Sequence, residues 1–329
     1  MPLASFTIAL AGVVVLCAGL PWAVACLLVP ALESSPGARA VNWRGANVVL
    51  GLGAVWTAWG GSALISAWLL EDLGSPSSVA AVLGTAGVLA VAASAFGLVD
   101  DAYGTGDARG FRGHLAALSR GRLTTGGLKL VGIGIASVVA ARAVAGVAEW
   151  GESPIGVLVA AASIALSANL VNLLDLRPGR ALKAYVVLAV AGAALVGSSA
   201  ARVAGGFGAD AALVGVALLG PAVACWRYDL GERAMLGDAG ANAMGAVAGL
   251  AIVSALPLAG VVAFGVAALV LNLLSERISF SAVIERARIL AWLDGLGRPR
   301  TPDSSTGPHD DGASRYDGNG SAGDGSLEV

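Results

Sequence analysis

Nine long apolar runs are the feature that most constrains how this 329-residue chain folds. A helix that crosses about 30 Å of hydrocarbon needs about 20 mostly apolar residues, and each run approaches or exceeds that length. Charged residues make up 13% of the chain, against roughly 25% in soluble domains. We therefore expect an all-α fold, a polytopic membrane helix bundle. The runs cover roughly residues 5–31, 47–70, 78–99, 128–149, 154–175, 181–204, 208–226, 238–256 and 258–275.

The number of spans depends on how the last two runs are connected. They are separated by Leu256, Pro257 and Leu258 alone, which leaves open nine spans, ten spans or a bent final pair. Glycine is frequent, with 47 residues, and small side chains let helices in lipid approach one another closely. We expect about nine to ten transmembrane helices in a tight bundle.

The basic residues of the short loops indicate how the bundle is oriented, because Lys and Arg are enriched in cytoplasmic loops. With the N-terminus outside, the cytoplasmic loops hold Arg39, Arg44, Arg109, Arg112, Arg120, Arg122, Lys129, Arg177, Arg180, Lys183, Arg227 and Arg233. The opposite loops hold Glu71, Asp72, Glu149 and Glu152, with Arg202 as their one clearly placed basic residue. This asymmetry predicts a multi-pass protein of the plasma membrane with its N-terminus outside.

Two segments follow the last span. Ser275–Gly297 carries apolar residues at a mixed period of three and four, which predicts an amphipathic helix on the cytoplasmic surface. Pro299–Val329 consists largely of Gly, Ser, Asp and Pro, which predicts a disordered tail. We therefore divide the chain into an integral membrane domain, 1–298, and a tail, 299–329.

Polar residues at the cytoplasmic ends of the spans are candidates for function, because charge in a membrane helix is costly. Asp100 and Asp101 end the third span and would be kept ionised by a divalent cation or by basic neighbours; a solvated helix stop is the alternative. Asn169, Asn172 and Asp175 lie at intervals of three on the fifth span. They predict contacts with a ligand or, alternatively, packing between helices.

A third cluster, Gly237–Asn242, starts the eighth span. Its Asp238 is either a helix N-cap or a carboxylate placed to hold a metal-bound diphosphate. Lys129 opens the fourth span after the long segment that contains His114, and long loops in compact bundles tend to be functional.

Three further basic residues, Arg177, Arg180 and Lys183, follow the fifth span. They are candidates for phosphate contacts, and anchoring at the membrane surface is an equal alternative.

In order and on one membrane face, these motifs resemble the polyprenyl-phosphate N-acetylhexosamine 1-phosphate transferase superfamily, relatives of phospho-N-acetylmuramoyl-pentapeptide transferase. The resemblance covers about residues 1–298. It matches Asp100 and Asp101 to the acidic pair of the family, Asn169, Asn172 and Asp175 to its Asn-x-x-Asn-x-x-Asp segment, Asp238 to its metal-binding Asp, Lys129 to its Lys after the acidic loop, and Asn42–Gly45 to its first cytoplasmic loop.

The chain departs from the family pattern at two places. Pro178 stands where the family usually has a second acid, and Glu276–Leu293 contains no His. These departures weaken the resemblance to the pentapeptide transferase in particular.

The resemblance implies transfer of a sugar 1-phosphate, with an N-acetylhexosamine as the expected sugar, from a UDP-sugar to undecaprenyl phosphate at the cytoplasmic face of a bacterial membrane, which starts a cell-envelope glycan. Mg²⁺, with Mn²⁺ as an alternative, needs one or two carboxylates, for which we favour Asp238 with Asp101 close by. Asp100 is placed to orient or deprotonate the lipid phosphate. Lys129, Arg177 and Lys183 supply positive charge for phosphoryl transfer.

The expected partners are thus undecaprenyl phosphate, a UDP-sugar and membrane lipid, with a homodimer left open. The net charge of −2 offers no basic surface to a nucleic acid. One rival interpretation is a catalytically silent relative that binds lipid phosphate or regulates glycan assembly. Another is an ion-coupled transporter, which would place acids near the middle of the membrane.

Overall fold

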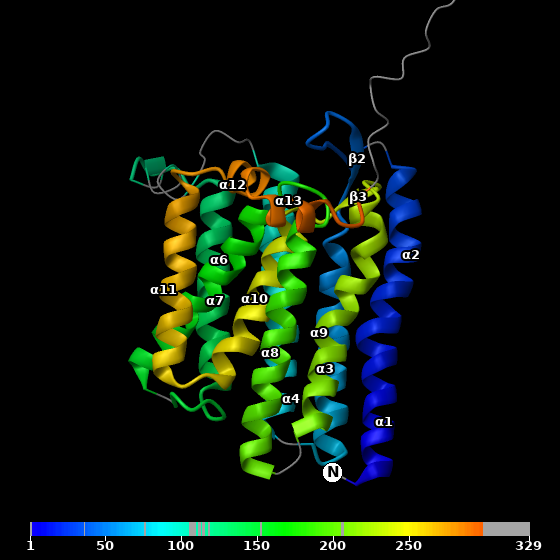
Figure 1. The fold of residues 1–329 in the computed structure, drawn as a ribbon, viewed down its shortest axis with the longest axis vertical. Coiled ribbons are helices and arrows are strands. Elements are labelled where there is room, and N and C mark those ends of the chain that lie inside the picture. The colour runs from blue at the N-terminus through cyan, green and yellow to red at the C-terminus, as the bar shows by residue number, and fades with distance from the viewer. Residues whose placement is uncertain are drawn as a thin grey trace, which may run out of the picture. The chain divides into compact units, whose positions relative to one another are not determined.

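The computed structural model describes residues 2–35, 37–75, 77–104, 110, 113, 116–117, 119–151, 153–204 and 207–298. Residues 1–298 group into one compact unit, an all-α bundle of long helices (Figure 1). Eight helices in the described residues are long and apolar enough to cross a membrane, so this is a multi-pass membrane protein. The proposed tail, 299–329, lies outside the described residues.

The long helices agree closely with the predicted runs. The first span, Leu3–Glu33, is continuous and consists of α1 (Leu3–Val13), the π-helical turn η1 (Val14–Gly19) and α2 (Leu20–Glu33). The other spans are α4 (Ser77–Tyr103), α6 (Thr125–Val144), α7 (Pro154–Leu174), α8 (Arg180–Ala204), α9 (Phe207–Leu230), α10 (Gly237–Ala255) and α11 (Leu258–Ser275). The turn at Pro257 separates α10 from α11, at the predicted division between the last two runs.

α3 (Ala54–Asp72) is also a long helix but is not among the eight most apolar ones in the described chain. It carries Trp, Ser and Gly on buried positions, which lowers its hydropathy without exposing it to water. Trp59 donates to the carbonyl of Ala217 on α9, and Trp56 packs edge-on against Tyr185 of α8. These contacts with α8 and α9 therefore explain why α3 lies within the bundle although it is less apolar than the other long helices.

A small sheet at one end of the bundle corrects the predicted start of the second run. β1 (Arg39–Val41) pairs antiparallel with β2 (Asn47–Leu50), and β2 pairs in parallel with β3 (Ala234–Met235). The span predicted from residue 47 therefore begins as a strand, and its helix starts at Ala54. A short apolar run does not by itself distinguish a strand from the start of a helix.

The expected amphipathic helix Ser275–Gly297 is also corrected. The segment forms two short helices, α12 (Phe280–Arg286) and α13 (Arg288–Gly295), which meet at Ala287. Ala287 has an extended backbone conformation, with φ −90° and ψ 105°, and this breaks the helix. Both short helices lie across the end of the bundle that carries the sheet, which we call the pocket end (Figure 1).

α10 is the centre of the bundle, and nearly all of its side chains are small and buried. Gly245 packs directly on the backbone of Ser167 in α7, and Gly97 of α4 packs on the backbone of Asp238 and Ala239. Helices in lipid gain little from apolar burial against each other, so close backbone contact is what holds them together.

We predict that Gly245→Ala destabilises the bundle, because its new Cβ would overlap the carbonyl of Ser167. Overpacking of this kind costs about 1–3 kcal/mol. Thermal unfolding of purified protein should show a lower Tm. Gly134→Ala is the matched control, since open space surrounds Gly134 on α6, and its Tm should be unchanged or higher. Equal Tm values for the two variants would contradict the proposed contact.

Candidate functional site

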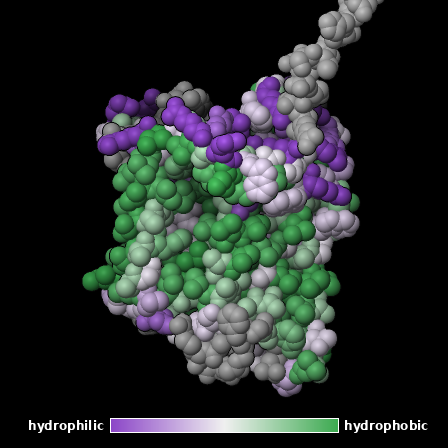
Figure 2. Space-filling view, in the orientation of Figure 1, coloured by the Kyte–Doolittle hydropathy of each residue, from purple (hydrophilic) through white to green (hydrophobic). Residues whose placement is uncertain are grey.

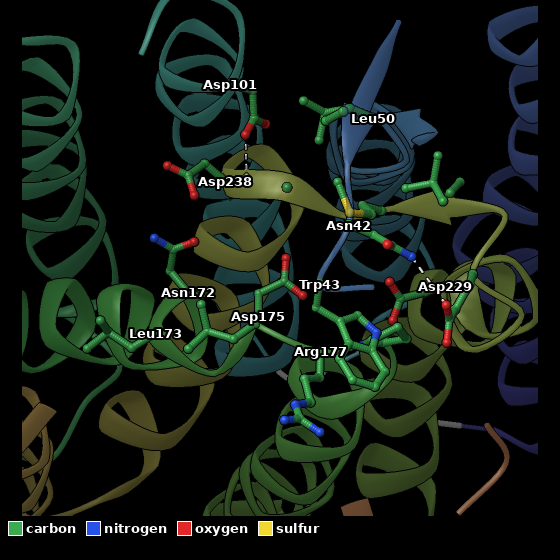
Figure 3. A pocket seen from close by; sticks show the side chains of 18 residues that line it. Asn42, Trp43, Leu50, Asp101, Asn172, Leu173, Asp175, Arg177, Asp229 and Asp238 are labelled. Atoms are coloured by element: carbon green, nitrogen blue, oxygen red, sulfur yellow. Dashed lines mark hydrogen bonds between the residues drawn. The ribbon is translucent and has the colours of Figure 1, made fainter. Parts of the chain in front are cut away.

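A cavity of about 470 Å³ opens at the pocket end, within the size range of small-molecule sites (Figure 3). The sheet forms one wall, and the ends of α4, α7 and α9 and the start of α10 form the others. The polar and aromatic residues of its lining are Asn42, Trp43, Asp101, Asn172, Asp175, Arg177, Asp229, Glu232 and Asp238. The cavity thus brings together residues of three predicted clusters: Asp101 of the acidic pair, Asn172 and Asp175 of the series on α7, and Asp238 at the start of α10.

Lys129 lies behind this cavity and joins three helices. Its ammonium group donates to Asp238 Oδ2 of α10 and lies 2.7 Å from Asp100 Oδ2 of α4. Lys129 is 8% exposed, so this is a buried ion pair with two carboxylates. Asp100 is not part of the cavity lining, and its carboxylate faces Lys129.

Asp101 caps α10 from a neighbouring helix. Its Oδ1 accepts from the backbone N–H of Asp238 at 2.8 Å, and its Oδ2 accepts from that of Ala239 at 3.0 Å. A carboxylate at this position accepts hydrogen bonds from N–H groups that have no partner within the helix. Its negative charge also interacts favourably with the positive end of the helix dipole. Asp238 itself lies in the first turn, so the alternative that made it the N-cap is wrong.

Gly237 is required where the chain enters α10. Its φ of +64° is in the left-handed region, and a Cβ would lie 2.7 Å from Asp101 Oδ2 and 2.8 Å from Leu50. A larger side chain here would displace both the cap and strand β2.

The series on α7 divides between two roles. Asn169 donates to Asn272 Oδ1 of α11 at 2.6 Å, so the helix-packing alternative holds for this residue. Asn172 and Asp175 instead line the cavity. Neither side chain has a hydrogen-bond partner among the described residues, and both are open to a ligand (Figure 3).

Asp175 lies just after α7, in strongly negative surroundings. Burial raises its pKa well above the ordinary value, and the nearby carboxylates of Asp229, Asp238 and Asp101 add to the increase. These surroundings therefore favour either the protonated form of Asp175 or a cation bound to its carboxylate.

The two basic residues after α7 hold other parts of the protein. Arg177 stacks on Trp43, 4.5 Å from the ring centroid, and pairs with Glu285 of α12. Lys183 donates to the carbonyls of Leu293 and Asp294 in α13 at 3.0 and 2.6 Å, and it does not line the cavity. Both side chains thus contact other parts of the protein, and phosphate binding and anchoring at the membrane surface both stay predictions.

Two acidic lining residues were not among the sequence candidates. Asp229 Oδ2 accepts from the N–H of Gly179 at 2.6 Å and fixes the turn after α7. Glu232, at φ +54°, accepts from Asn42 and pairs with Arg44, which holds the β1–β2 turn. The predicted span ended at residue 226, whereas α9 continues to Leu230. Asp229 and Glu232 follow a predicted span on the same side of the membrane as the other acids, and this was the signal in the sequence that could have identified them.

Five carboxylates therefore face one cavity, and Arg177 is the one basic residue in its described lining. No group of three His, Cys, Asp or Glu side chains among the described residues is arranged as a metal cage. Mg²⁺ commonly takes one or two carboxylates and completes its shell with water and substrate oxygens. Asp238, with the unpartnered Asn172 and Asp175 beside it, fits such a shared site. His114 lies outside the described residues.

No protein-family model matches this chain, and neither does any curated protein.

We predict that Lys129→Met destabilises the protein strongly, because it leaves Asp100 and Asp238 without their shared cation. Removing one partner of a buried ion pair costs about 3–5 kcal/mol. Thermal unfolding should show a large decrease in Tm, which Asp100→Asn in the same chain should partly reverse. If Lys129→Met alone leaves the Tm unchanged, the buried network does not hold the helices together.

Proposed function

We propose that this protein transfers a sugar 1-phosphate from a UDP-sugar to undecaprenyl phosphate, with release of UMP. The observation that supports this most directly is the cavity where Asp238, Asn172 and Asp175 face one another at the end of a membrane bundle. A membrane lipid phosphate and a soluble nucleotide can both reach such a location. The order of the motifs along the chain resembles the transferase superfamily and supports the same reaction.

The reaction forms one phosphorus–oxygen bond and breaks another. An oxygen of the lipid phosphate attacks the β-phosphorus of the UDP-sugar, and the bond from that phosphorus to the bridging oxygen of UMP breaks. A phosphate monoester is largely ionised at neutral pH, so the nucleophile needs little help from a base. The main obstacle is repulsion between the two anions and the acidic cavity.

The residues of this chain address that repulsion in two ways. Asp238 would hold Mg²⁺, with Mn²⁺ as an alternative. Asp175 takes the place expected for Asp101, because both oxygens of Asp101 accept from backbone N–H groups of α10. Asn172 is placed to contribute an amide oxygen or to donate to a phosphate. The bound cation would neutralise charge on the transferred phosphoryl group. Lys129 keeps Asp238 fixed and offsets its charge from behind the cavity. Asp101 orients the start of α10.

A non-catalytic relative that binds lipid phosphate is the second candidate. Arg177 and Lys183, expected to contact phosphate, are engaged with α12 and α13 instead. Pro178, in place of the usual acid, also lines the cavity. An ion-coupled transporter is less well supported, because the charged residues of the described site gather at one end of the bundle rather than at its middle.

The transferase proposal predicts a labelled lipid product. Purified protein should be incubated with undecaprenyl phosphate, a panel of radiolabelled UDP-sugars and Mg²⁺, and the lipid fraction and UMP should be measured. Asp238→Asn should lower turnover by more than about 100-fold, because it removes a charge that holds the metal. Asp72→Asn, an exposed residue at the other end of α3, is the control and should retain activity. Binding of UDP-sugar without any product would favour the non-catalytic relative.

The proposed reaction also requires the pocket end to face the cytoplasm. We predict that Arg120→Cys, exposed at the pocket end, is shielded from an impermeant thiol reagent in intact cells. Gly146→Cys, exposed beyond the other end of α6, should react. Cys26→Ser serves as the background, since Cys17 and Cys225 are buried. Labelling at position 120 but not 146 would reverse the orientation and remove access to cytoplasmic nucleotides.

A further inference from the structure

The two short helices after α11 expose a strongly apolar surface. Ile289 of α13 is 74% exposed and Trp292 is 65% exposed. Leu290, Leu293 and Val283 are each 43% to 44% exposed. Side chains of this size are rarely left in water as a contiguous patch, so this surface needs a covering.

The patch continues a surface that already faces lipid. The outward side of α11 exposes a run of large apolar residues, Val262, Val266, Leu269, Val270, Leu273 and Leu274, and Ile278 links it to α12. On the face shown in Figure 2 the apolar band of the bundle reaches the level of α12 and α13, and hydrophilic residues gather beyond it. The patch therefore lies at the boundary between hydrocarbon and water.

The residues of the patch favour lipid as its covering over residues 299–329 of the same chain. Arg277, Arg286 and Arg288 lie among its apolar residues, and basic residues near an apolar helix face attract anionic headgroups. Residues 299–329 contain Leu327 and Val329 as their only large aliphatic side chains, which is too little to cover the patch. Trp is also typical of the membrane interface.

The opposite side of α13 is fastened to the pocket wall. Asp294, 8% exposed, accepts from Arg180 at 2.9 Å through both of its oxygens, and it accepts from Arg298 at 2.7 and 3.0 Å. Arg298 also donates to the carbonyl of Pro178 at 2.7 Å, and Lys183 donates to α13 carbonyls. The segment Pro178–Lys183, which begins at the cavity lining, is thereby tied to α13.

This fastening persists across the neutral pH range. Burial of Asp294 works against ionisation, but hydrogen bonds from Arg180 and Arg298 outweigh it and lower the pKa to about 2. A depressed pKa means that the stabilisation is complete above the ordinary carboxyl pKa and is lost as the pH falls toward about 2.

We propose that α13 is an interfacial anchor: its Ile289 and Trp292 face inserts among the lipid headgroups at the pocket end, and its Asp294 face fixes the Pro178–Lys183 wall of the cavity at that depth. The anchor holds the cavity beside the membrane surface, where a lipid headgroup can enter it. The sequence pattern predicted a surface helix; the structure assigns its lipid-facing side and the wall that it holds.

Insertion can be measured with single-cysteine variants in lipid nanodiscs. Ile289→Cys and Trp292→Cys, in the Cys26→Ser background, are labelled with an environment-sensitive fluorophore. Glu285→Cys is the matched control, because Glu285 lies on α12 and is directed to Arg177. Spin-labelled lipids should quench the labels at 289 and 292 at least about twofold more than the label at 285, and aqueous iodide should show the reverse order.

Two results would overturn insertion. Equal access of iodide to all three labels would place the patch in water. Shielding of positions 289 and 292 from both quenchers would mean that protein, such as a second copy of the chain, covers the patch.

The fastening is tested by the distance between spin labels on Ile289→Cys and Leu176→Cys, both at exposed positions. The distance distribution should be narrow, and Asp294→Asn should broaden it, whereas Asp72→Asn should not. An unchanged distribution in Asp294→Asn would show that Asp294 does not hold the wall. Neither measurement uses enzyme activity, so the anchor and the proposed transferase reaction are tested separately.

Discussion

A buried ammonium group shared by two carboxylates is the interaction on which the pocket end of this membrane protein depends. Lys129 comes from α6, Asp100 from α4 and Asp238 from α10, so one cation fixes three helices at the same level. Ionised groups at the end of apolar helices are costly unless they are paired. The pairing brings the ends of these three helices together at one point, beside the close packing of their small residues.

The same arrangement determines what the cavity can bind. Asp101 follows Asp100 in the sequence but points to α10, where it caps the helix that carries Asp238. Asp229 and Glu232 hold turns, so their charges are partly compensated by donors. Asp175 and Asn172 are left without partners in the described residues and face Asp238. An acidic cavity with free oxygen ligands favours a cation.

The basic residues beside the cavity serve the surrounding structure. Arg177 joins Trp43 of the hairpin to Glu285 of α12, and Lys183 joins α8 to the end of α13. Positive charge is thus used to join the cavity wall to α12 and α13. A transferase built in this way would rely on its metal ion for charge neutralisation more than on arginine or lysine contacts.

The sequence by itself determined the bundle. Runs of about 20 apolar residues have few alternatives in lipid, because a helix satisfies its own backbone hydrogen bonds. It also placed Asp101, Asn172, Asp175 and Asp238 at one end of the molecule, and the structure brings them into one cavity.

Tertiary structure alone decided the partners of each side chain. Asn169 and Asn172 are one helical turn apart, yet the first faces Asn272 and the second faces the cavity, because α11 covers just one of them. The strand at Asn47–Leu50 likewise pairs with β3, a distant segment that a local pattern does not include.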